Sequence, residues 1–242
     1  MKKITCIYLL LLLNTNHLLG QQLTGKELLD KAIAYHDPKN IWSTFNGTLH
    51  ITMETPNASN RESDIQIHIP KEYFNLISKR DSTSKTYTLS KGVCIISKKD
   101  SIGIAKQTKK PKRSHCEMAE LYKNYYTYLY GLPMKLQDPG TMINNKVEQK
   151  TFKGKDYLVL KVNYKADVGS DVWYFYFNPN TYAMEVYQFF KTDENGKIKP
   201  KSGEYILLTE EEIINDIKMP KIRAWYYNKD DKYLGTDILK LY

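Results

Sequence analysis

Apolar and polar residues alternate along residues 44–54, with the period of two that is typical of a half-buried β-strand. The apolar positions are Phe45, Leu49, Ile51 and Met53. The polar positions between them are Thr48, His50 and Thr52. Because successive side chains of a strand point to opposite faces, the pattern predicts one buried face and one exposed face.

Short runs of alternating or mostly apolar residues follow along the rest of the chain. They predict strands at residues 65–69, 73–77, 87–89, 93–96, 102–105, 151–152, 157–164, 172–177, 182–190, 204–208 and 221–227. Turn-forming residues separate several of these runs, as at Lys153-Gly154-Lys155-Asp156 and Asn178-Pro179-Asn180. Strands joined by such short turns pair antiparallel.

Two other segments repeat apolar residues every three or four positions, which predicts amphipathic helices. The first begins at Thr24, whose hydroxyl is placed to cap a helix with Glu27 three residues on, and it ends before Asp37-Pro38. The second spans residues 114–130 and ends at Gly131 and Pro133. Its apolar face consists of Met118, Leu121, Tyr122, Tyr125, Tyr128 and Leu129.

The order of these elements predicts the fold class. Many short strands with only two helices indicate a mainly β (α+β) fold, built as a single curled antiparallel sheet. A parallel α/β architecture is disfavoured, because strands and helices do not alternate. No repeat or linker divides the chain, so we expect residues 21–242 to form a single domain.

Residues 1–20 have the three-part layout of a signal peptide. Lys2 and Lys3 precede an apolar run at residues 4–13, and a more polar tail ends at Gly20. The apolar run is too short to span a bilayer comfortably. Cys6 lies inside this run, away from the expected cleavage point after Gly20, which argues against a lipid-anchored lipoprotein. We therefore expect an exported protein.

The formal net charge is +9, and Lys2 and Lys3 account for two of these charges. A basic balance raises the prospect of nucleic acid or an anionic membrane as partner. The basic residues are spread along the chain apart from one cluster: Lys106, Lys109, Lys110, Lys112 and Arg113. Because the cluster contains Pro111 and has no apolar periodicity, we interpret it as a solvated loop rather than a contact surface. Nucleic acid is not an expected partner.

Two cysteines remain after removal of the leader, Cys94 and Cys116. An even number of cysteines in an exported protein favours a disulfide, and two buried free thiols are the alternative. A metal site has little support, because CxxC spacing is absent and His115 is the only nearby histidine.

No pattern in the chain predicts catalysis. GxSxG, HExxH and Walker sequences are absent, and the histidines do not pair at HxH or HxxxH spacing. We therefore expect a non-catalytic protein without a cofactor or metal. Asp81-Ser82-Thr83 and Asp100-Ser101-Ile102 resemble acceptor sites for periplasmic O-glycosylation, and the sequence does not decide whether either is used.

Three blocks of the sequence resemble a family of exported Gram-negative bacterial proteins of unknown function. The first is Glu27-Leu28-Leu29, Ile33-Ala34-Tyr35-His36-Asp37-Pro38, Trp42, Phe45-Asn46-Gly47 and Met53-Glu54-Thr55-Pro56. The second is Asn124-Tyr125-Tyr126-Thr127-Tyr128-Leu129-Tyr130-Gly131-Leu132-Pro133-Met134-Lys135-Leu136 with Asp138-Pro139-Gly140-Thr141. The third is Pro220-Lys221-Ile222-Arg223, Trp225-Tyr226, Asn228 and Tyr233-Leu234-Gly235-Thr236-Asp237.

That family is distantly similar to LolA/LppX-like carriers of lipoproteins and lipids. The resemblance implies an incomplete barrel whose helices cover an apolar concave cavity. It implies a periplasmic, monomeric binding or carrier protein for a lipid or acyl chain, in transient contact with the envelope membrane. The expected ligand-binding residues are Leu121, Tyr122, Tyr125, Leu129, Leu49 and Ile51.

Three hypotheses about function follow from the sequence. The first is the carrier just described, in which the aromatic segment 114–130 forms one wall of the cavity. The second is a structural or interaction domain of the envelope, in which the same helix only completes the core. The third is an exported hydrolase, which would need carboxylates or histidines that converge in a cleft.

Overall fold

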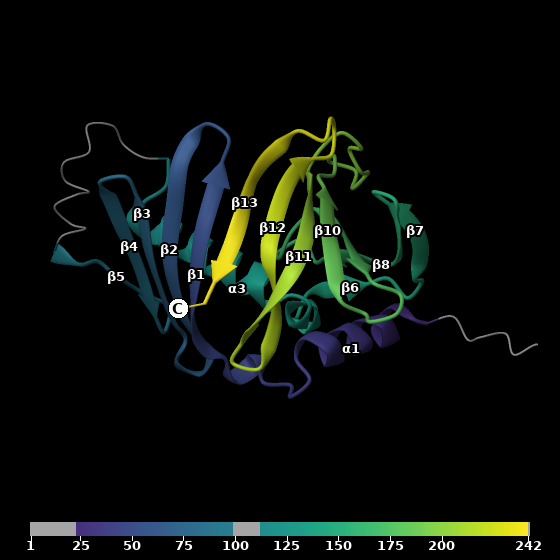
Figure 1. Cartoon of the computed structure of the whole chain (residues 1–242), viewed down its shortest axis with the longest axis horizontal. Helices are drawn as coiled ribbons and strands as arrows, with labels where there is room; N and C mark the ends of the chain where they lie inside the picture. Colours follow the sequence, from purple (N-terminus) through teal and green to yellow (C-terminus); the bar gives the residue numbers. More distant parts are fainter. Residues whose placement is uncertain (1–22, 99–111, 242) are drawn as a thin grey trace, which may run out of the picture.

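The computed structural model describes residues 23–98 and 112–241. In this part of the chain thirteen strands form one open antiparallel sheet, which confirms the predicted fold class (Figure 1). The strands are β1 (Asn46–Thr55), β2 (Ala58–His68), β3 (Tyr73–Arg80), β4 (Thr83–Ser90), β5 (Val93–Ile95), β6 (Thr141–Ile143), β7 (Glu148–Phe152), β8 (Lys155–Tyr164), β9 (Val172–Phe177), β10 (Met184–Phe190), β11 (Glu204–Ile214), β12 (Ile217–Tyr227) and β13 (Tyr233–Lys240).

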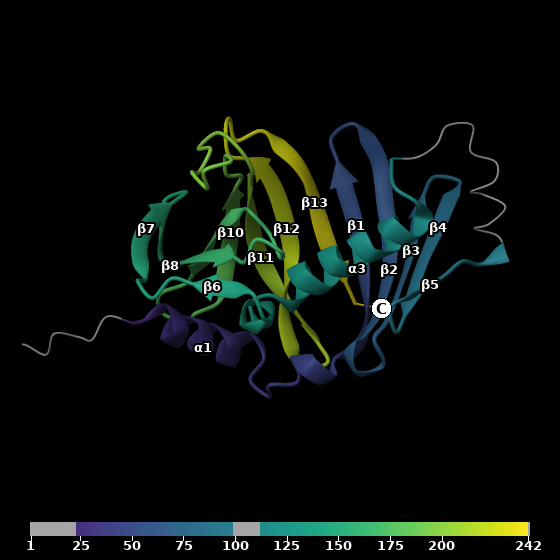
Figure 2. The ribbon, with the colours of Figure 1, turned by 180° about the vertical axis from the view of Figure 1, so that it is seen from behind.

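The sheet consists of two meanders joined in the middle. Its order is β5-β4-β3-β2-β1-β13-β12-β11-β10-β9-β8-β6, and β7 also pairs with β8. The first strand therefore pairs with the last, with His50 opposite Lys240. Both meanders bend toward the same side. The helix α3 (His115–Gly131) crosses this concave side, and the helix α1 (Gly25–His36) lies along the lower ends of the strands of the C-terminal meander (Figure 2).

The alternation predicted for the first strand is found over residues 48–51 of β1 and breaks at the next two positions, because Thr52 is buried and Met53 only half-buried. Leu49 and Ile51 are buried against the concave side, as predicted. Thr52 was expected to be exposed but is buried, because its hydroxyl donates to Glu62 on β2 at 2.7 Å. The neighbouring polar position His50 is half-buried, and its Nδ1 lies 2.7 Å from Asp64 on the same strand β2. Polar pairs between β1 and β2 thus cover the face of β1 opposite to Leu49 and Ile51.

α1 begins and ends where the sequence predicts. The Thr24 hydroxyl accepts the Glu27 backbone N–H, and the Glu27 carboxylate accepts the Thr24 backbone N–H, which completes a capping box. Gly25 allows this helix to approach the neighbouring loop closely, since a Cβ there would lie 2.0 Å from the carbonyl oxygen of Asn144. The buried face of α1 includes Leu28, Leu29, Ala32 and Ile33.

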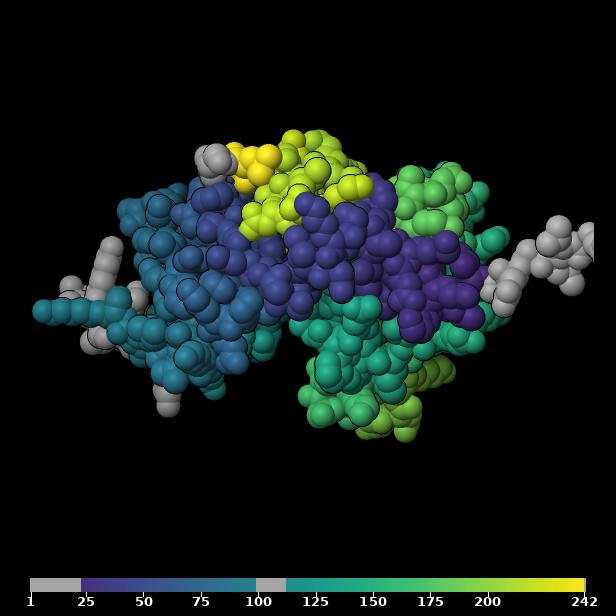
Figure 3. Space-filling view, turned by 90° about the horizontal axis from the view of Figure 1, so that it is seen from below, coloured from purple at the N-terminus to yellow at the C-terminus, as the bar shows by residue number. Residues whose placement is uncertain are grey.

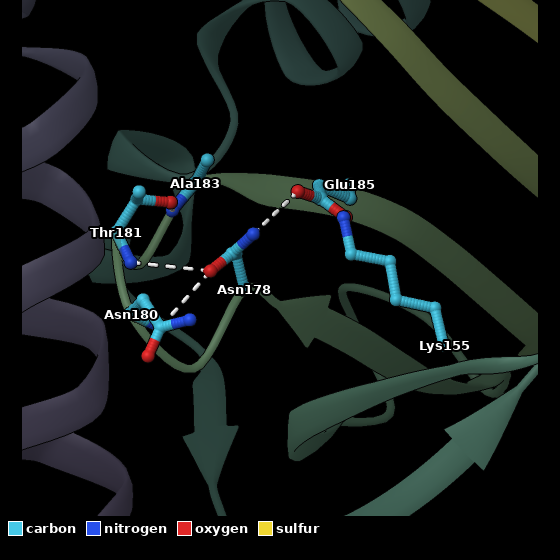
Figure 4. Close-up of polar contacts among 6 residues, drawn as sticks. All are labelled: Lys155, Asn178, Asn180, Thr181, Ala183 and Glu185. Atoms are coloured by element: carbon cyan, nitrogen blue, oxygen red, sulfur yellow. Dashed lines mark hydrogen bonds and ion pairs between the residues drawn. The ribbon is translucent and has the colours of Figure 1, made fainter.

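The β9–β10 hairpin illustrates how polar side chains fix the turns. Asn178 accepts the backbone N–H groups of Asn180 and Thr181 at 2.9 and 3.2 Å (Figure 4). Its amide nitrogen donates to Glu185 at 2.9 Å, and Glu185 also forms an ion pair with Lys155 of β8. The turn predicted from Asn178-Pro179-Asn180 is therefore held by the side chain of its first residue.

Several predictions concern residues outside the described ranges. They are the signal peptide at residues 1–20, the strand at residues 102–105, the pattern Asp100-Ser101-Ile102, and the basic residues Lys106, Lys109 and Lys110. Lys112 and Arg113 are described and exposed, in the bend before α3. Asp81-Ser82-Thr83 lies at the exposed turn between β3 and β4.

Candidate functional site

α3 lies across the concave side of the sheet, where Figure 2 shows it in front of the strands. Ser114 caps this helix, since its hydroxyl accepts the Glu117 backbone N–H while the Glu117 carboxylate accepts the Ser114 N–H. A disulfide joins Cys116 in its first turn to Cys94 on β5, with 5.6 Å between the two Cα atoms. The helix is thus tied covalently to one edge of the sheet.

A pocket of about 650 Å³ lies beside the C-terminal half of α3. Its walls come from α3, from the 3-10 turn η3 (Met134–Gln137), from the segment 164–171, and from β9, β10, β11 and β12. The lining residues are Asn124, Tyr125, Thr127, Tyr128, Leu129, Lys135, Asp138, Tyr164, Val168, Gly169, Ser170, Asp171, Trp173, Phe189, Glu204 and Trp225. In the view from below, the surface has a deep notch between its blue-teal part, near β3 to β5, and its green-teal part (Figure 3).

Six of the sixteen lining residues are aromatic. Trp173 stacks on Phe189 at 4.9 Å between ring centroids, and its edge meets Tyr128 at 5.7 Å. On the other side Tyr125 stacks on Trp225 at 6.3 Å. Trp173 and Phe189 lie opposite each other in the β9–β10 register, so the pairing of these strands places both rings on the concave side. The arrangement suits a ligand with a large apolar surface.

Several polar groups of the lining pair with one another. Lys135 forms an ion pair with Asp138, and the hydroxyls of Tyr128 and Tyr164 are hydrogen-bonded to each other. Burial raises the pKa of Tyr164 to about 12, so both phenols are neutral at physiological pH.

Two further carboxylates line the pocket, Asp171 just before β9 and Glu204 at the start of β11. Burial raises the pKa of each carboxyl above its ordinary value, although the positive charge of Lys191 opposes the rise. Among the described residues neither carboxylate forms an ion pair. They are therefore partly desolvated acids beside an aromatic wall.

The pocket contains two of the six predicted ligand-binding residues. Tyr125 and Leu129 belong to its lining. Leu121, on the same helix, has 40% of its surface exposed and lies away from the pocket. Tyr122 is half-buried against Tyr87 of β4, at 5.1 Å between ring centroids.

The two predicted ligand-binding residues of β1 also lie outside the pocket lining. Leu49 and Ile51 are 0% and 1% exposed and belong to the hydrophobic core. Of the helix that was predicted to form one wall of a ligand cavity, only the C-terminal half therefore reaches the pocket.

Most of the pocket lining was not predicted from the sequence. Trp173, Phe189, Trp225, Tyr164 and the two free carboxylates come from separate strands and loops. The period of two in residues 172–177 could have indicated that Trp173 shares the face of Phe175 and Phe177. Which rings from other strands join it depends on strand order, which a single sequence does not contain.

A buried polar layer lies between α3 and the centre of the sheet. Arg223 and Asp237 are cross-strand neighbours on β12 and β13, with 1% and 2% of their surfaces exposed. The Arg223 guanidinium lies 3.7 Å from the ring centroid of Tyr130, and Arg61 donates to the Tyr126 hydroxyl at 3.1 Å. Burial raises the pKa of Asp237, and the charges of Arg223 and Arg61 oppose this rise. α3 is therefore seated partly by cation–π and polar contacts.

Within residues 23–98 and 112–241, no three His, Cys, Asp or Glu side chains are grouped closely enough to hold a metal ion. In the same ranges, no helix has the length and hydrophobicity needed to cross a bilayer.

The sequence model of a protein family described as "Family of unknown function (DUF6503)" matches residues 2–240 of this chain. A search of curated proteins gave no match. The fold is similar to that of a LolA superfamily protein from Nitrosomonas europaea, with a TM-score of 0.51 and 10% identity. It is also similar to that of a DUF1329 family protein from Desulfovibrio piger, with a TM-score of 0.50 and 9% identity. Each comparison covers 90% of this chain and 92% of the other.

Proposed function

Since the chain belongs to the DUF6503 family, whose function is unknown, we propose a function from its own pocket: it is a non-catalytic binding or carrier protein for a hydrophobic ligand such as a lipid or acyl chain. The aromatic pocket beside α3 is the observation that carries this proposal. The similarity of fold to a LolA superfamily protein is consistent with it.

The size and the chemistry of the pocket support this assignment. Its volume of about 650 Å³ lies within the range of roughly 300–1,000 Å³ that small-molecule sites occupy. Each Å² of apolar ligand surface buried there would contribute about 25 cal/mol before the costs of binding. Tyr125, Trp173 and Trp225 contribute aromatic surface to the lining for such burial.

The proposed site of action is the periplasm. A signal peptide at residues 1–20 would bring the single domain of residues 21–242 there, and a disulfide between Cys94 and Cys116 is stable in oxidising compartments. We propose that the protein acts as a monomer and contacts the envelope membrane transiently to load or release its ligand.

Uptake of laurdan, an uncharged fluorophore with a long acyl chain, tests this function. We expect saturable binding to the purified protein, and a several-fold loss of affinity in Phe189→Ala, which removes one face of the pocket. Leu121→Ala is the matched control, because it removes a large apolar side chain from the exposed surface of α3. Circular dichroism checks that both variants fold.

Absence of laurdan uptake by the wild-type protein would contradict the proposal. Equal losses in the two variants would also contradict it, because the probe would then bind outside the pocket. Native mass spectrometry after incubation with extracted lipids would identify the natural ligand.

One observation favours a second candidate, hydrolysis of a polymer. Asp171 and Glu204 are carboxylates with raised pKa in a cleft, and general acids have this property. Turnover of an envelope polysaccharide that is abolished by Glu204→Gln would favour this enzyme over the carrier.

A further inference from the structure

Unpartnered hydrogen-bond donors gather in the buried polar layer between α3 and the sheet. In the described part of the chain, buried nitrogen or oxygen atoms without a hydrogen-bond partner belong to six residues of this layer and its border with the pocket: Arg61, Ser63, Tyr130, Tyr187, Arg223 and Trp225. The N–H groups of arginine and tryptophan can only donate, and the hydroxyls can donate as well as accept. The layer therefore suits a group that is rich in acceptor oxygens.

The same layer carries more positive than negative charge. Met53 of β1 pairs with Arg61 on one side and with Asp237 on the other, and Asp237 pairs with Arg223. The two arginines and the aspartate thus lie in one row across β2, β1, β13 and β12, with about 4.8 Å between adjacent strands. Within residues 23–98 and 112–241 neither arginine forms an ion pair. Two guanidinium groups and one carboxylate leave the row with an excess of one positive charge.

Burial makes this excess of charge unfavourable in the empty protein. Arg223 is 1% exposed, and a buried charge without a counter-charge costs free energy. An anion beside the two arginines would offset the charge and accept the unpartnered N–H groups by charge-assisted hydrogen bonds. Water molecules would accept the same hydrogen bonds, but they would not offset the charge.

Trp225 connects the layer to the pocket. Its ring belongs to the pocket lining, and its Nε1–H is one of the unpartnered donors. It lies two residues from Arg223 on β12, which is about 7 Å along a strand and on the same face. Tyr187, whose hydroxyl is also unpartnered, contacts the rings of Trp225 and Trp173 at 6.1 and 6.2 Å between centroids. A headgroup beside the indole N–H would therefore adjoin the layer while its chain lies in the pocket.

The position of Glu204 favours the same orientation of a ligand. This residue of the lining lies opposite Tyr227, which is four residues from Arg223 on β12. At about 3.3 Å per residue, the carboxylate lies roughly 13 Å along the sheet from the row of arginines. An anionic headgroup would be repelled at the end of Glu204 and attracted at the end of Arg223.

We propose that the buried polar layer binds the anionic headgroup, a carboxylate or a phosphate, of the ligand whose apolar part lies in the pocket. This inference rests on the proposed function and names the chemistry of the ligand's polar end. Arg61 and Arg223 supply the positive charge, and Trp225 supplies a neutral donor at the border with the pocket. An ionised fatty acid or a lipid with a phosphate group is the class of molecule that fits.

Isothermal titration calorimetry with ligands of equal chain length tests the inference. Dodecanol, dodecanoate and dodecyl phosphate are compared at pH 7.5, below their critical micelle concentrations, where both acids are ionised. We expect one or both anions to bind at least about tenfold more tightly than dodecanol, and the tighter anion identifies the headgroup. Inorganic phosphate and acetate, which lack the chain, should bind at least about tenfold more weakly than the dodecyl anions.

Two variants should change the affinity for the anions in opposite directions. Arg61→Gln removes a positive charge from a half-buried position and should remove most of the preference for the anions. Asp237→Asn removes the carboxylate between the two arginines and should strengthen anion binding several-fold. Both variants should bind dodecanol as the wild type does, and circular dichroism checks that they fold. Arg113→Gln is the matched control, because it removes an exposed arginine just before α3 and should keep the preference.

The outcomes separate the inference from the function on which it rests. Equal or tighter binding of dodecanol would overturn the anionic headgroup and leave a carrier of uncharged chains. A preference that Arg61→Gln leaves unchanged, or that Asp237→Asn weakens, would overturn the assignment to the buried polar layer. Binding of inorganic phosphate or acetate as tight as that of the dodecyl anions would overturn the link between the layer and the pocket. Failure of all three dodecyl ligands to bind would contradict the proposed function itself.

Discussion

The side chain of His36 joins α1 to two strands by hydrogen bonds at both ring nitrogens. Its Nδ1–H donates to the carbonyl oxygen of Lys218 on β12 at 2.8 Å, and its Nε2 accepts the backbone N–H of Met184 on β10 at 2.9 Å. A carbonyl can only accept and an amide N–H can only donate, so the ring carries one proton and is neutral. The residue is 0% exposed, and burial lowers its pKa.

This arrangement predicts how stability depends on pH. In the unfolded chain His36 binds a proton below about pH 6.5, whereas the folded state resists protonation until a lower pH. The unfolded state therefore binds more protons in that interval, so the free energy of unfolding falls as pH is lowered from about 6.5 toward the folded pKa. Urea unfolding between pH 7.5 and 5 measures this loss.

His36→Gln provides the comparison, because glutamine has a similar polar end and does not titrate. The variant should be less stable than the wild type at pH 7.5 and should lose less stability on acidification. Parallel pH profiles of the two proteins would show that another group causes the acid sensitivity.

At the scale of secondary-structure elements, the disulfide between Cys94 and Cys116 connects strand β5 to helix α3. The two cysteines are 22 positions apart in sequence, and the bridge holds the first turn of α3 at the outer strand of the N-terminal meander. For a loop of this length, the chain-entropy estimate of its stabilisation is about 3 kcal/mol.

We expect Cys94→Ser/Cys116→Ser to lower the free energy of unfolding by about 3 kcal/mol. Denaturant unfolding of the variant and of the wild type, with and without dithiothreitol, measures the difference. Dithiothreitol should destabilise the wild type and leave the variant unchanged. Equal stability of the variant and the oxidised wild type would contradict the estimate.

The elements were predictable where local chemistry determines them. The capping box at Thr24, the apolar spacing along residues 114–130 and the alternation along β1 gave both helices and the first strand close to their observed bounds. β13 was missed, although it lies at the centre of the sheet. Its inward positions are Gly235, Asp237 and Leu239, and a glycine and a carboxylate there conceal the period of two. Asp237 faces inward because Arg223 and Arg61 lie near it.

At the scale of the whole molecule, the two meanders are joined along the pairing of β1 with β13. Five registered residue pairs form this join, from His50 opposite Lys240 to Glu54 opposite Thr236. The pocket is lined by α3, η3 and the C-terminal meander, whereas the disulfide anchors α3 to the N-terminal meander. Composition and alternation predicted a curled antiparallel sheet. They did not predict its division into two meanders, because that division depends on pairings between residues far apart in sequence.

A chain that ends after Asn228 tests the importance of this join. Removal of β13 leaves β1 and β12 without a shared neighbour, so we expect loss of the single cooperative unfolding transition and increased binding of anilinonaphthalene sulfonate. Urea unfolding followed by both fluorescence and circular dichroism measures this. Coincident, steep transitions like those of the full chain would show that the two meanders are held together without β13.

The pairing of the first strand with the last also limits the order in which the sheet can assemble. Hairpins β1–β2 and β11–β12 join strands that are neighbours in sequence, but the two meanders can join only once residues 233–240 are in place. Until then β1 and β12 each present an open edge, and open edges pair readily with other chains. The last strand of the chain therefore both completes the sheet and protects two aggregation-prone edges.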